Sequence, residues 1–410
     1  MIQTANLKIG FIGWNPFQLL HVKKVIEALP GSCFILEQRA DYLDEFDNSL
    51  LTNPSVPVLV WPRATIDALD GIFDIIVCQV PFSKIQNFTK SRIAMMQYGY
   101  AKEVHNYGAW RSFSSLSLAY GDYAARKLSH FGPALPVGNS RYDDWASTEF
   151  HESAKRDHFS GLDPSRKTIL YAPTWGDLSS IEEFSGAVFD LSEKYNVVLK
   201  MHHNTALLES GRVGKISNPK IKYFGANADL MELLSIADLA ISDYSGAIFD
   251  ALFAQKPVVL LDMDLTKVMG KKIDVHSLEY EQRDAIGMRV SRPDMLLDTV
   301  DAAFEQEAQL IAKAAPLRKD LFNDSPGATQ RIVQALQDLG TGLHEPSQIQ
   351  SYVRSEIIEL YKAKAKITSL TKKIETLEAA AKYAANANAK VSAKTSVMKP
   401  AAAAKKIRKI

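Results

Sequence analysis

A chain of 410 residues, of which 46% are hydrophobic and 23% charged, can bury the cores of two domains and is too apolar for a disordered protein. Its formal net charge of +1 hides an uneven distribution, because residues 347–410 hold 14 Lys or Arg against 4 Asp or Glu and the rest is net acidic. An acidic body without basic-aromatic motifs excludes nucleic acid as the expected partner. The two cysteines, Cys33 and Cys78, are too few for a disulfide-stapled scaffold and fit a reducing compartment.

The first residues show no basic start followed by a long apolar stretch, so no signal peptide is predicted. No segment approaches the roughly 20 apolar residues that cross a bilayer. We therefore expect a cytoplasmic protein that at most lies peripherally against the cytoplasmic face of the membrane.

Short apolar runs alternate with turn-rich and helical segments through residues 1–150. Strands are predicted at 8–12, 32–36, 58–61, 72–78, 93–96 and 116–120, with a helix from 15 to about 29. This alternation is typical of an α/β fold with a largely parallel, doubly wound sheet. The polar segment 151–165 is interpreted as an irregular linker.

A second α/β domain is predicted over 164–340, where the alternation is clearer. Strands are expected at 168–172, 197–201, 221–224, 239–242 and 258–261, and helices at 182–195, 230–236 and 246–254. In such sheets ligands bind outside the carboxyl ends of the strands, so the residues that follow each strand are the candidates for a site.

A third region begins after Gly340 and Gly342. From Val353 onward, apolar residues recur every seven positions with a second set three positions later, which predicts a coiled coil or amphipathic helix over 347–385. Residues 386–410 are rich in Ala and Lys and are predicted to be a low-complexity tail. This basic region could pair with a copy of itself or a partner helix, contact anionic lipid, or simply be solvated.

The turn between the fourth strand and the third helix of the second domain is the strongest candidate site. The strand runs through Ser242 into Asp243 and Tyr244, and a helix is predicted from Ser245. The amides of Ser245 and Gly246, with the positive end of the helix, could bind a phosphate. The alternative is structural, with Ser245 only capping the helix and Asp243 only fixing the turn.

Two further strand ends of the second domain carry polar or aromatic groups. Thr174 could hydrogen-bond a donor and Trp175 could wall a pocket; the alternative is that Pro173 and Gly176 only form a turn and Trp175 belongs to the core. His202 could donate to a phosphate or act as an acid or base, or be a structural histidine. His202 and His203 follow one another on a strand and would point to opposite faces, so we do not expect them to bind one metal together.

In the first domain, the loop at 97–108 is dense in polar and aromatic groups and would face the cleft where an acceptor enters. His105 is its best-placed ionisable base, and the alternative is a plain surface histidine. In the second domain, Asp262 and Asp264 form a DxD-like pair, but short acidic turns are common and no metal site is predicted.

Four ordered segments together resemble the CDP-glycerol glycerophosphotransferase family, the teichoic-acid primases and polymerases. They read YAPTW at 171–175, KMHHN at 200–204, ADLAISDYSGAIFDALFAQKPVVLLD at 237–262 and GNSRYDD at 138–144, with Ser140 where the family has proline. Their order and spacing match the family from about residue 95 to 262. The resemblance implies a GT-B fold, in which an acceptor-side Rossmann-like domain (1–150) and a nucleotide-donor-binding domain (164–340) face a cleft.

The resemblance also implies a reaction. A polyol phosphate, glycerol phosphate above all, would pass from a CDP-linked donor to a hydroxyl of a polyol-phosphate or glycan acceptor, free or lipid-linked, with release of CMP during synthesis of a teichoic-acid-like or capsule polymer. The donor is a substrate, so neither a cofactor nor a metal is expected. Pattern and resemblance together assign His202, His105 and Asp243 to catalysis; Thr174, Trp175, His202, Ser242, Tyr244, Ser245, Gly246 and Asp250 to the donor; and Tyr98, Gly99 and Arg141 to the acceptor side.

One motif departs from the family. Where the family carries His-Gly-Thr, with that histidine as the base, this chain reads Gln97-Tyr98-Gly99-Tyr100. A tyrosine with a pKa near 10 is a poor base at neutral pH. Either His105 or another group replaces the histidine, or the reaction differs, or activity is lost. The alternatives are a GT-B glycosyltransferase that uses a nucleotide sugar, and a catalytically degenerate assembly protein that acts through its basic helical tail.

Overall fold

The computed structural model describes residues 7–15, 17–39, 56–213, 216, 218–225, 227–266 and 273–397, with side chains as far as residue 386 and without those of 206–208, 210 and 213. The chain divides into two compact units, Met1–Arg354 and Ser355–Ile410. The first unit holds two α/β domains and the second holds most of one long helix.

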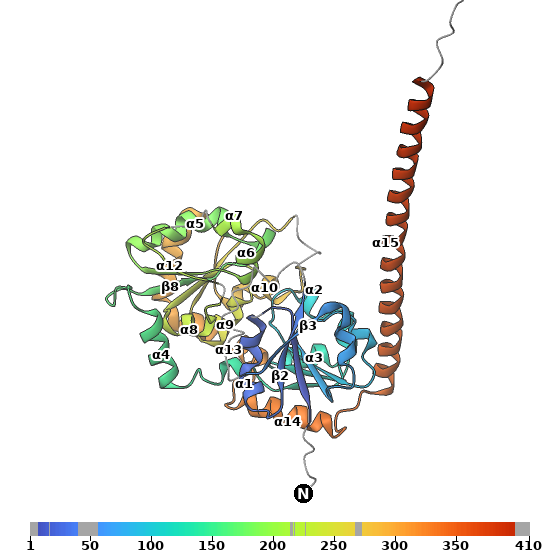
Figure 1. Cartoon of the computed structure of the whole chain (residues 1–410). Helices are drawn as coiled ribbons and strands as arrows, with labels where there is room; N and C mark the ends of the chain where they lie inside the picture. The colour runs from blue at the N-terminus through green and yellow to red at the C-terminus, as the bar shows by residue number, and fades with distance from the viewer. Residues whose placement is uncertain are drawn as a thin grey trace, which may run out of the picture. The chain divides into compact units, whose positions relative to one another are not determined.

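The first domain is built on a seven-stranded parallel sheet with the order β3-β2-β1-β4-β5-β6-β7 (Figure 1). The order reverses between β1 and β4, which makes a topological switch point. Cys33 and Cys78 lie buried and unbridged in β2 and β4. The elements are β1 (Ile9–Gly13), α1 (Phe17–Glu27), β2 (Cys33–Gln38), β3 (Val58–Pro62), β4 (Ile75–Cys78), β5 (Arg92–Met96), α2 (Glu103–Asn106), β6 (Leu116–Ala119), α3 (Asp122–Leu128) and β7 (Ala134–Pro136).

The second domain repeats this plan with a six-stranded parallel sheet of order β10-β9-β8-β11-β12-β13, and its switch point lies between β8 and β11. The predicted pair of doubly wound parallel sheets is confirmed. Its strands are β8 (Thr168–Tyr171), β9 (Asn196–Lys200), β10 (Lys222–Phe224), β11 (Leu239–Ser242), β12 (Val258–Leu261) and β13 (Met288–Val290). Its helices are α5 (Ile181–Asp190), α6 (His203–Leu208), α7 (Ser210–Val213), α8 (Leu230–Ile236), α9 (Ala247–Phe253), α10 (Leu278–Glu281), α11 (Arg283–Ile286), α12 (Leu296–Glu305) and α13 (Glu307–Leu321).

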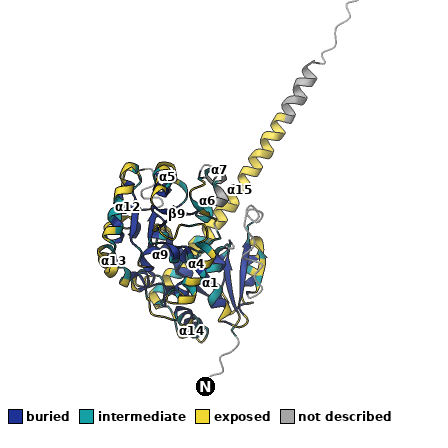
Figure 2. Cartoon of the chain, turned by 90° about the vertical axis from the view of Figure 1, so that its left-hand side faces the viewer, coloured by how far each residue is buried: buried dark blue, intermediate teal, exposed yellow. Residues whose placement is uncertain are grey.

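The central strands of both sheets are buried, as Figure 2 shows, and an aromatic cluster joins the two domains. Tyr142 of the first domain stacks on Phe253 of the second with ring centroids 3.8 Å apart. Tyr100 lies 5.4 Å from Phe249 and 5.6 Å from Phe322 between ring centroids. Because aromatic side chains bury large apolar areas, this cluster stabilises the contact between the domains.

Helix α4 (Thr148–His158) occupies most of the segment that was predicted to be an irregular linker, and that prediction is wrong. Ser147 caps the helix by accepting a hydrogen bond from the Phe150 amide at 3.4 Å. Of the residues of α4, only Ala154 is fully buried, in the packing against α8. A helix with so few apolar residues lacks the periodicity that predicts a helix from sequence.

Helix α14 (Ala328–Gly340) returns to the first domain, where Ile332, Leu336 and Leu339 join the core of the first sheet. The predicted second domain, 164–340, therefore ends on a helix that packs in the first. Periodicity in the sequence shows that a helix has an apolar face but does not show which sheet covers it.

Two edge strands, β7 and β13, have no counterpart among the predictions. Each is three residues long, which is too short for alternation between two faces to be visible. Strand β7 also ends on Pro136, a residue that sheets tolerate at their edges.

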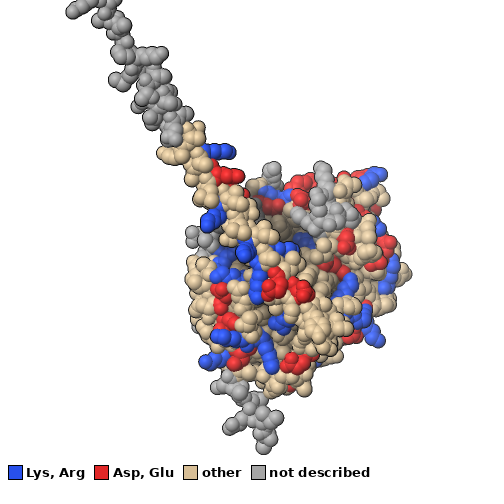
Figure 3. Space-filling model, turned by 90° about the vertical axis from the view of Figure 1, so that its right-hand side faces the viewer, with Lys and Arg blue, Asp and Glu red and all other residues tan. Residues whose placement is uncertain are grey.

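Helix α15 (Gln348–Val397) makes up the described part of the second unit and begins within the first. It covers the predicted helix at 347–385 and runs into the predicted tail at 386–410, of which 398–410 lie outside the described residues. Figure 3 shows Lys and Arg side chains along it, with a few acidic ones. None of the helices in the described part of the chain is both long and apolar enough to span a membrane.

Candidate active site

One cavity of about 440 Å³ receives residues from the carboxyl ends of strands in both sheets. The first domain lines it with residues after β1, β4 and β5 and with α1, and the second with residues after β8, β9 and β11. Both switch points therefore open onto it, as expected for a ligand site in sheets of this type. The predicted site residues that line it are Tyr98, Gly99, His105, Arg141, Thr174, Trp175, His202, Ser245, Gly246 and Asp250, whereas Ser242, Asp243 and Tyr244 are not among the lining residues.

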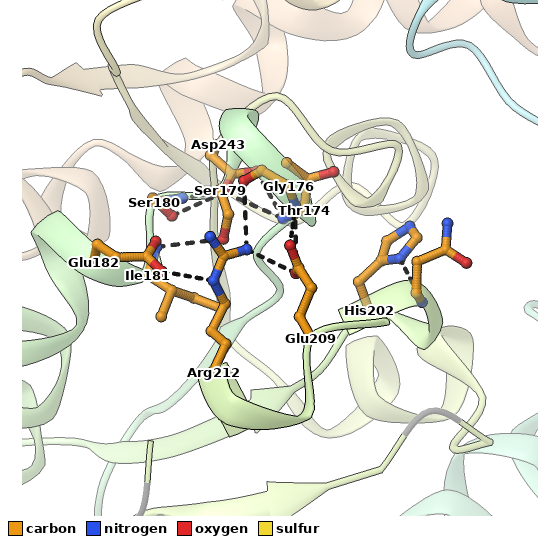
Figure 4. A network of polar contacts seen from close by, with 11 residues as sticks. Thr174, Gly176, Ser179, Ser180, Ile181, Glu182, His202, Glu209, Arg212 and Asp243 are labelled. Carbon is orange, nitrogen blue, oxygen red and sulfur yellow. Dashed lines mark hydrogen bonds and ion pairs between the residues drawn. The ribbon is translucent and has the colours of Figure 1, made fainter. Parts of the chain in front are cut away.

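Asp243 holds the loop after β8 in place from a fully buried position at the end of β11. Its carboxylate accepts hydrogen bonds from the Thr174 amide, the Ser180 amide and the Ser180 hydroxyl, each at 2.9 Å (Figure 4). Burial raises the pKa of Asp243, and the hydrogen bonds from Ser180 and Thr174 oppose that rise. Asp243 therefore orients Thr174, and the structure does not place its carboxylate at the cavity.

Ser242 and Tyr244, predicted to bind the donor, also support the cavity wall from behind. The Ser242 hydroxyl donates a hydrogen bond to the Ala172 carbonyl oxygen at 2.6 Å, which ties β11 to the loop after β8. Tyr244 packs against the Arg283 guanidinium, whose carbon lies 4.2 Å from the ring centroid. Both side chains are buried, so neither reaches the cavity.

Ser245 and Gly246 are the part of this turn that faces the cavity. The Ser245 hydroxyl accepts a hydrogen bond from the Ala247 amide at 3.3 Å, at the first residue of α9. Ser245 therefore caps the helix, as the structural alternative expected, and also lines the cavity. Both residues line the cavity and could contact a ligand there.

Trp175 is presented by a loop that charged groups brace from the outside (Figure 4). The Gly176 amide donates to Glu209 at 3.2 Å, and Glu209 pairs with Arg212 at 2.7 Å. Arg212 also pairs with Glu182 of α5 at 2.6 Å. These contacts hold the indole ring at the cavity wall without using the side chains that line the cavity itself.

His202 and His203 lie side by side in the cavity, with ring centroids 4.3 Å apart and an interplanar angle of 27°. The prediction that they point to opposite faces is wrong, because β9 ends at Lys200 and His202 caps α6. The His202 Nδ1 accepts a hydrogen bond from the Asn204 amide at 3.1 Å, so the neutral ring carries its proton on Nε2. Burial, with His203, Lys102 and Lys200 nearby, lowers the pKa of His202 well below its usual range.

Lys200, the last residue of β9, is a buried cation that lines the cavity and that sequence reasoning did not single out. Burial lowers its pKa to about 8, and Asp229 opposes that shift. Its ammonium nitrogen lies 5.5 Å from the centroid of the Phe17 ring. The signal that could have found it is a lysine inside an otherwise apolar buried strand, since lysine is almost never buried without a role.

Arg141, predicted on the acceptor side, bridges the two domains. It pairs with Asp229 at 3.0 Å and lies 3.8 Å from Asp250, both from the second domain. Burial alone would lower the pKa of Arg141, but Asp229 and Asp250 more than offset it and the pKa is raised. Asp250 also accepts a hydrogen bond from the Tyr142 hydroxyl at 2.8 Å. Both carboxylates are therefore compensated, and Lys200 remains to meet an anionic ligand.

The first-domain wall carries Tyr98 and His105, as predicted. Burial raises the pKa of Tyr98 to about 12, so its phenol stays protonated at neutral pH. His105, on α2, is exposed as a residue, and partial desolvation of its ring, together with Lys102 and Arg111, lowers its pKa. Tyr98 is therefore a poor base at neutral pH, and the His105 ring is largely unprotonated there.

His21, on α1, also lines this wall and was missed by sequence reasoning. Its ring stacks on Tyr98 with centroids 5.1 Å apart and meets Phe17 edge-on at 5.3 Å. Burial, with Arg141, His203 and Lys200 nearby, lowers the pKa of His21 well below its usual range. A histidine among the apolar positions of an amphipathic helix was the available signal.

The cavity thus combines a buried ammonium group, neutral imidazoles and aromatic rings. That combination suits a ligand with phosphate groups and an aromatic or polyol part. Asp262 of the DxD-like pair is engaged by Arg283 at 2.7 Å and Arg289 at 2.8 Å. Over the described ranges, no group of three or more His, Cys, Asp or Glu side chains could hold a metal ion.

Sequence comparisons identify the family of the chain. The profile of the family described as CDP-Glycerol:Poly(glycerophosphate) glycerophosphotransferase matches residues 125–338. The teichoic acid glycerol-phosphate transferase of Staphylococcus aureus (strain NCTC 8325 / PS 47) is 27% identical over 182 residues, which are 42% of this chain and 45% of that protein. The chain spans less than half the length of the curated relatives that it matches.

Solved structures show the same fold. The Wall Teichoic Acid Polymerase TagF superposes with a TM-score of 0.57 at 17% identity, covering 83% of this chain and 90% of that one. The UDP-GlcNAc 2-epimerase of Neisseria meningitidis, bound to UDP-GlcNAc, superposes with a TM-score of 0.55 at 14% identity, covering 80% and 99%. At these identities the likeness establishes the fold, and the predicted GT-B architecture is confirmed.

Proposed function

This chain belongs to the CDP-glycerol:poly(glycerophosphate) glycerophosphotransferase family, and we propose from that premise that it transfers glycerol phosphate from CDP-glycerol to an acceptor hydroxyl. The acceptor is a polyol-phosphate or glycan chain, free or lipid-linked, of a teichoic-acid-like or capsule polymer. The name of the Staphylococcus aureus relative, a teichoic acid glycerol-phosphate transferase, supports this assignment.

The proposed reaction is a substitution at phosphorus. The acceptor oxygen forms a bond to the phosphorus that carries glycerol, and the bond from that phosphorus to the oxygen shared with CMP breaks. CMP leaves with the electron pair of that bond, and the acceptor proton passes to a base. Catalysis then consists of positioning the two substrates and stabilising negative charge on the phosphate oxygens.

The second domain supplies groups that suit the donor phosphates. Lys200 offers a buried positive charge, and the Nε2–H of His202 offers a hydrogen bond to an oxygen anion. Ser245 and Gly246, at the start of α9, line the same cavity. Trp175 provides an aromatic wall against which a cytosine ring can stack.

The observation that carries the proposal is the convergence of separate motifs on one cavity. Thr174, Lys200, His202 and Ser245 come from three different strand ends, yet all line the same space between the domains. Each of these residues lies in a segment that resembles a motif of the family. All four residues fall within residues 125–338, the region that the family profile matches. Random coincidence of core and turn residues would not place them together.

The experiment is release of CMP from CDP-glycerol by the purified chain, with oligomeric and lipid-linked polyol-phosphate acceptors, beside UDP- and CDP-linked sugars. We expect acceptor-dependent CMP release that His202→Ala lowers by about 10²–10³-fold, the typical effect of removing one donor that stabilises a developing oxyanion. His130→Ala, at an exposed site outside the cavity, is the matched control and should keep wild-type turnover.

Two outcomes contradict the proposal. Turnover of a nucleotide sugar with no CMP release from CDP-glycerol identifies a glycosyltransferase on the same fold. Silence with every donor, in a chain that melts cooperatively, identifies a degenerate core whose work is done elsewhere in the molecule.

We place this reaction in the cytoplasm, with the long helix touching the membrane surface peripherally. The support is a set of exposed lysines on α15 that can meet anionic headgroups, namely Lys362, Lys364, Lys366, Lys372 and Lys373. Flotation with vesicles that contain an anionic phospholipid should recover the full chain and leave a chain truncated after residue 346 behind. Equal flotation of both chains would show that α15 does not mediate membrane binding.

A further inference from the structure

His21 is a buried side chain with unused hydrogen-bonding groups. It is 5% exposed, and neither Nδ1 nor Nε2 has a hydrogen-bond partner within the described part of the chain. Buried polar groups are normally hydrogen-bonded, so an unpaired imidazole in a cavity wall calls for an explanation. Because His21 lies in the cavity wall, a substrate group that enters the cavity could supply the missing hydrogen-bond partner.

The surroundings of His21 place it between the two halves of the cavity. On one side its ring stacks on Tyr98, and on the other it meets Phe17, which itself stacks on His203 of the donor domain with centroids 4.9 Å apart. The main-chain oxygen of His21 accepts a hydrogen bond from the Ser140 hydroxyl at 3.2 Å. This bond ties α1 to the segment that carries Arg141 and fixes the backbone from which the ring extends.

The charge environment keeps this imidazole neutral. Burial and the cations Arg141 and Lys200, with His203, all disfavour the protonated ring, so its lone pair is free at neutral pH. A bound pyrophosphate would bring negative charge into the same cavity and make protonation of the ring easier. His21 is therefore unprotonated before the donor binds and a better proton acceptor once it has bound.

We propose that His21 is the base that takes the proton from the acceptor hydroxyl, an inference that rests on the proposed phosphotransferase activity. As the acceptor oxygen bonds to the glycerol-bearing phosphorus and CMP departs, the hydroxyl proton moves to a ring nitrogen of His21. The proton then returns to solvent. His105, exposed on α2, is the competing candidate that the sequence indicated.

Turnover of CDP-glycerol separates these candidates. His21→Gln is expected to lower kcat by about 10²–10⁴-fold, the usual contribution of a general base, with little change in the Kd of CDP-glycerol from calorimetry. His105→Gln tests the rival base and is expected to lose much less activity than His21→Gln, while His130→Gln, outside the cavity, is the matched control. Added imidazole should restore part of the activity of His21→Ala, which a purely structural role would not allow.

The inference is overturned if His21→Gln turns over at the wild-type rate, or if the loss appears in His105→Gln instead. Wild-type protein that releases no CMP with any acceptor contradicts the proposed function itself, and this inference with it. Thermal melting identifies a variant that does not fold, and the glutamine variant then replaces the alanine variant because it keeps most of the side-chain volume.

Helix α15 carries an independent inference, because its apolar seam is exposed. The exposed fractions are 63% for Ile367, 51% for Leu370, 55% for Ile374 and 59% for Leu377. These residues occupy alternate seam positions, a and d, of two successive heptads, with Leu360 at the preceding a position. A helix with such a seam gains stability by burying it against another helix.

The residues beside the seam indicate what that helix is. In a parallel pair in register, each g residue meets the e residue five positions later on the partner helix. Glu359 would then face Lys364, and Lys373 would face Glu378. Lys366 would face Thr371, so no like charges meet from 352 to 385. Isoleucine at a with leucine at d favours two parallel strands.

We infer that two copies of this chain pair through α15 as a parallel two-stranded coiled coil. The self-complementary g and e charges select a second copy over an unrelated helix. The pairing buries the four exposed seam residues of each helix at once.

Sedimentation of the full chain tests this pairing. Wild-type protein is expected to be a dimer at micromolar concentration, and Leu377→Lys a monomer. Lys373→Glu should raise the dimer Kd several-fold, the double variant Lys373→Glu/Glu378→Lys should restore it, and Lys382→Glu, which lies off the seam, is the matched control. Leu370→Cys should crosslink two chains under mild oxidation, because parallel d positions face each other.

A wild-type chain that stays monomeric up to about 100 μM overturns the inference, since that limit leaves less than about 6 kcal/mol for pairing. A dimer that survives Leu377→Lys places the interface elsewhere. A dimer that Leu370→Cys cannot crosslink shows that the helices are not parallel and in register.

Discussion

At the residue scale, the cavity holds most of its titratable groups in uncharged or compensated forms. Burial favours neutral His21, His202 and His203, and Arg141 compensates Asp229 and Asp250. Such an environment strengthens every interaction with a phosphate that enters it, because little water competes. Lys200 is the group whose charge state is most open to change.

Lys200 is expected to make donor binding depend on pH. Its pKa is about 8, so the ammonium form dominates below that pH and is lost as the pH rises through it. The affinity for CDP-glycerol should therefore fall by roughly tenfold per pH unit above about pH 8, as linkage requires. Calorimetric titrations between about pH 6.5 and 9.5 measure this, and Lys200→Arg, which stays charged throughout, should give a flat profile. A flat profile in the wild type would show that Lys200 does not contact the donor.

The residue roles were predictable only in part. Thr174, His202 and Ser245 follow strands, and a strand end in a doubly wound sheet is where ligands bind, so their place in the cavity follows from sequence. The sequence does not show that the Asp243 carboxylate points inward. That carboxylate accepts three hydrogen bonds from the loop after β8, and the Thr174 amide in that loop is 69 residues away in the chain. His21 depends on packing of α1 against Tyr98, which no local pattern reports.

At the scale of elements, Gly121 makes a close contact with the end of α13. A Cβ at Gly121 would lie 2.2 Å from the Leu321 carbonyl oxygen, so no side chain fits there. Gly121→Ala is expected to lower the free energy of unfolding by about 1–3 kcal/mol through overpacking. Gly186→Ala, in α5 with open space around it, is the control and should raise it by up to about 1 kcal/mol.

Chemical denaturation of both variants measures these changes. Equal effects of the two substitutions would show that the chain relaxes around Gly121 without cost, and that the α13 junction does not limit stability.

The elements themselves were largely predictable where they are long or apolar. Strands β1, β9 and β11 follow from buried apolar runs, whereas β7 and β13 are too short to show a pattern. Helix α4 was missed because its surface is polar, and its helical state depends on packing against α8.

At the scale of the whole molecule, the GT-B arrangement followed from the family resemblance and not from periodicity. The return of α14 to the first domain could not be predicted, because its apolar face fits either sheet. That return, the aromatic cluster around Tyr142 and the Arg141 bridge all hold the domains together at the cavity. The first unit therefore presents the cavity walls of its two domains as one preorganised site.

The most direct test of the central claim uses CDP-glycerol labelled both in its glycerol carbon and in the phosphorus attached to glycerol. If the chain is a glycerophosphotransferase, both labels enter the acceptor polymer in equal amounts and one CMP is released for each. If the polymer gains no label while a nucleotide sugar is consumed, or if the two labels separate, the transfer of glycerol phosphate is contradicted.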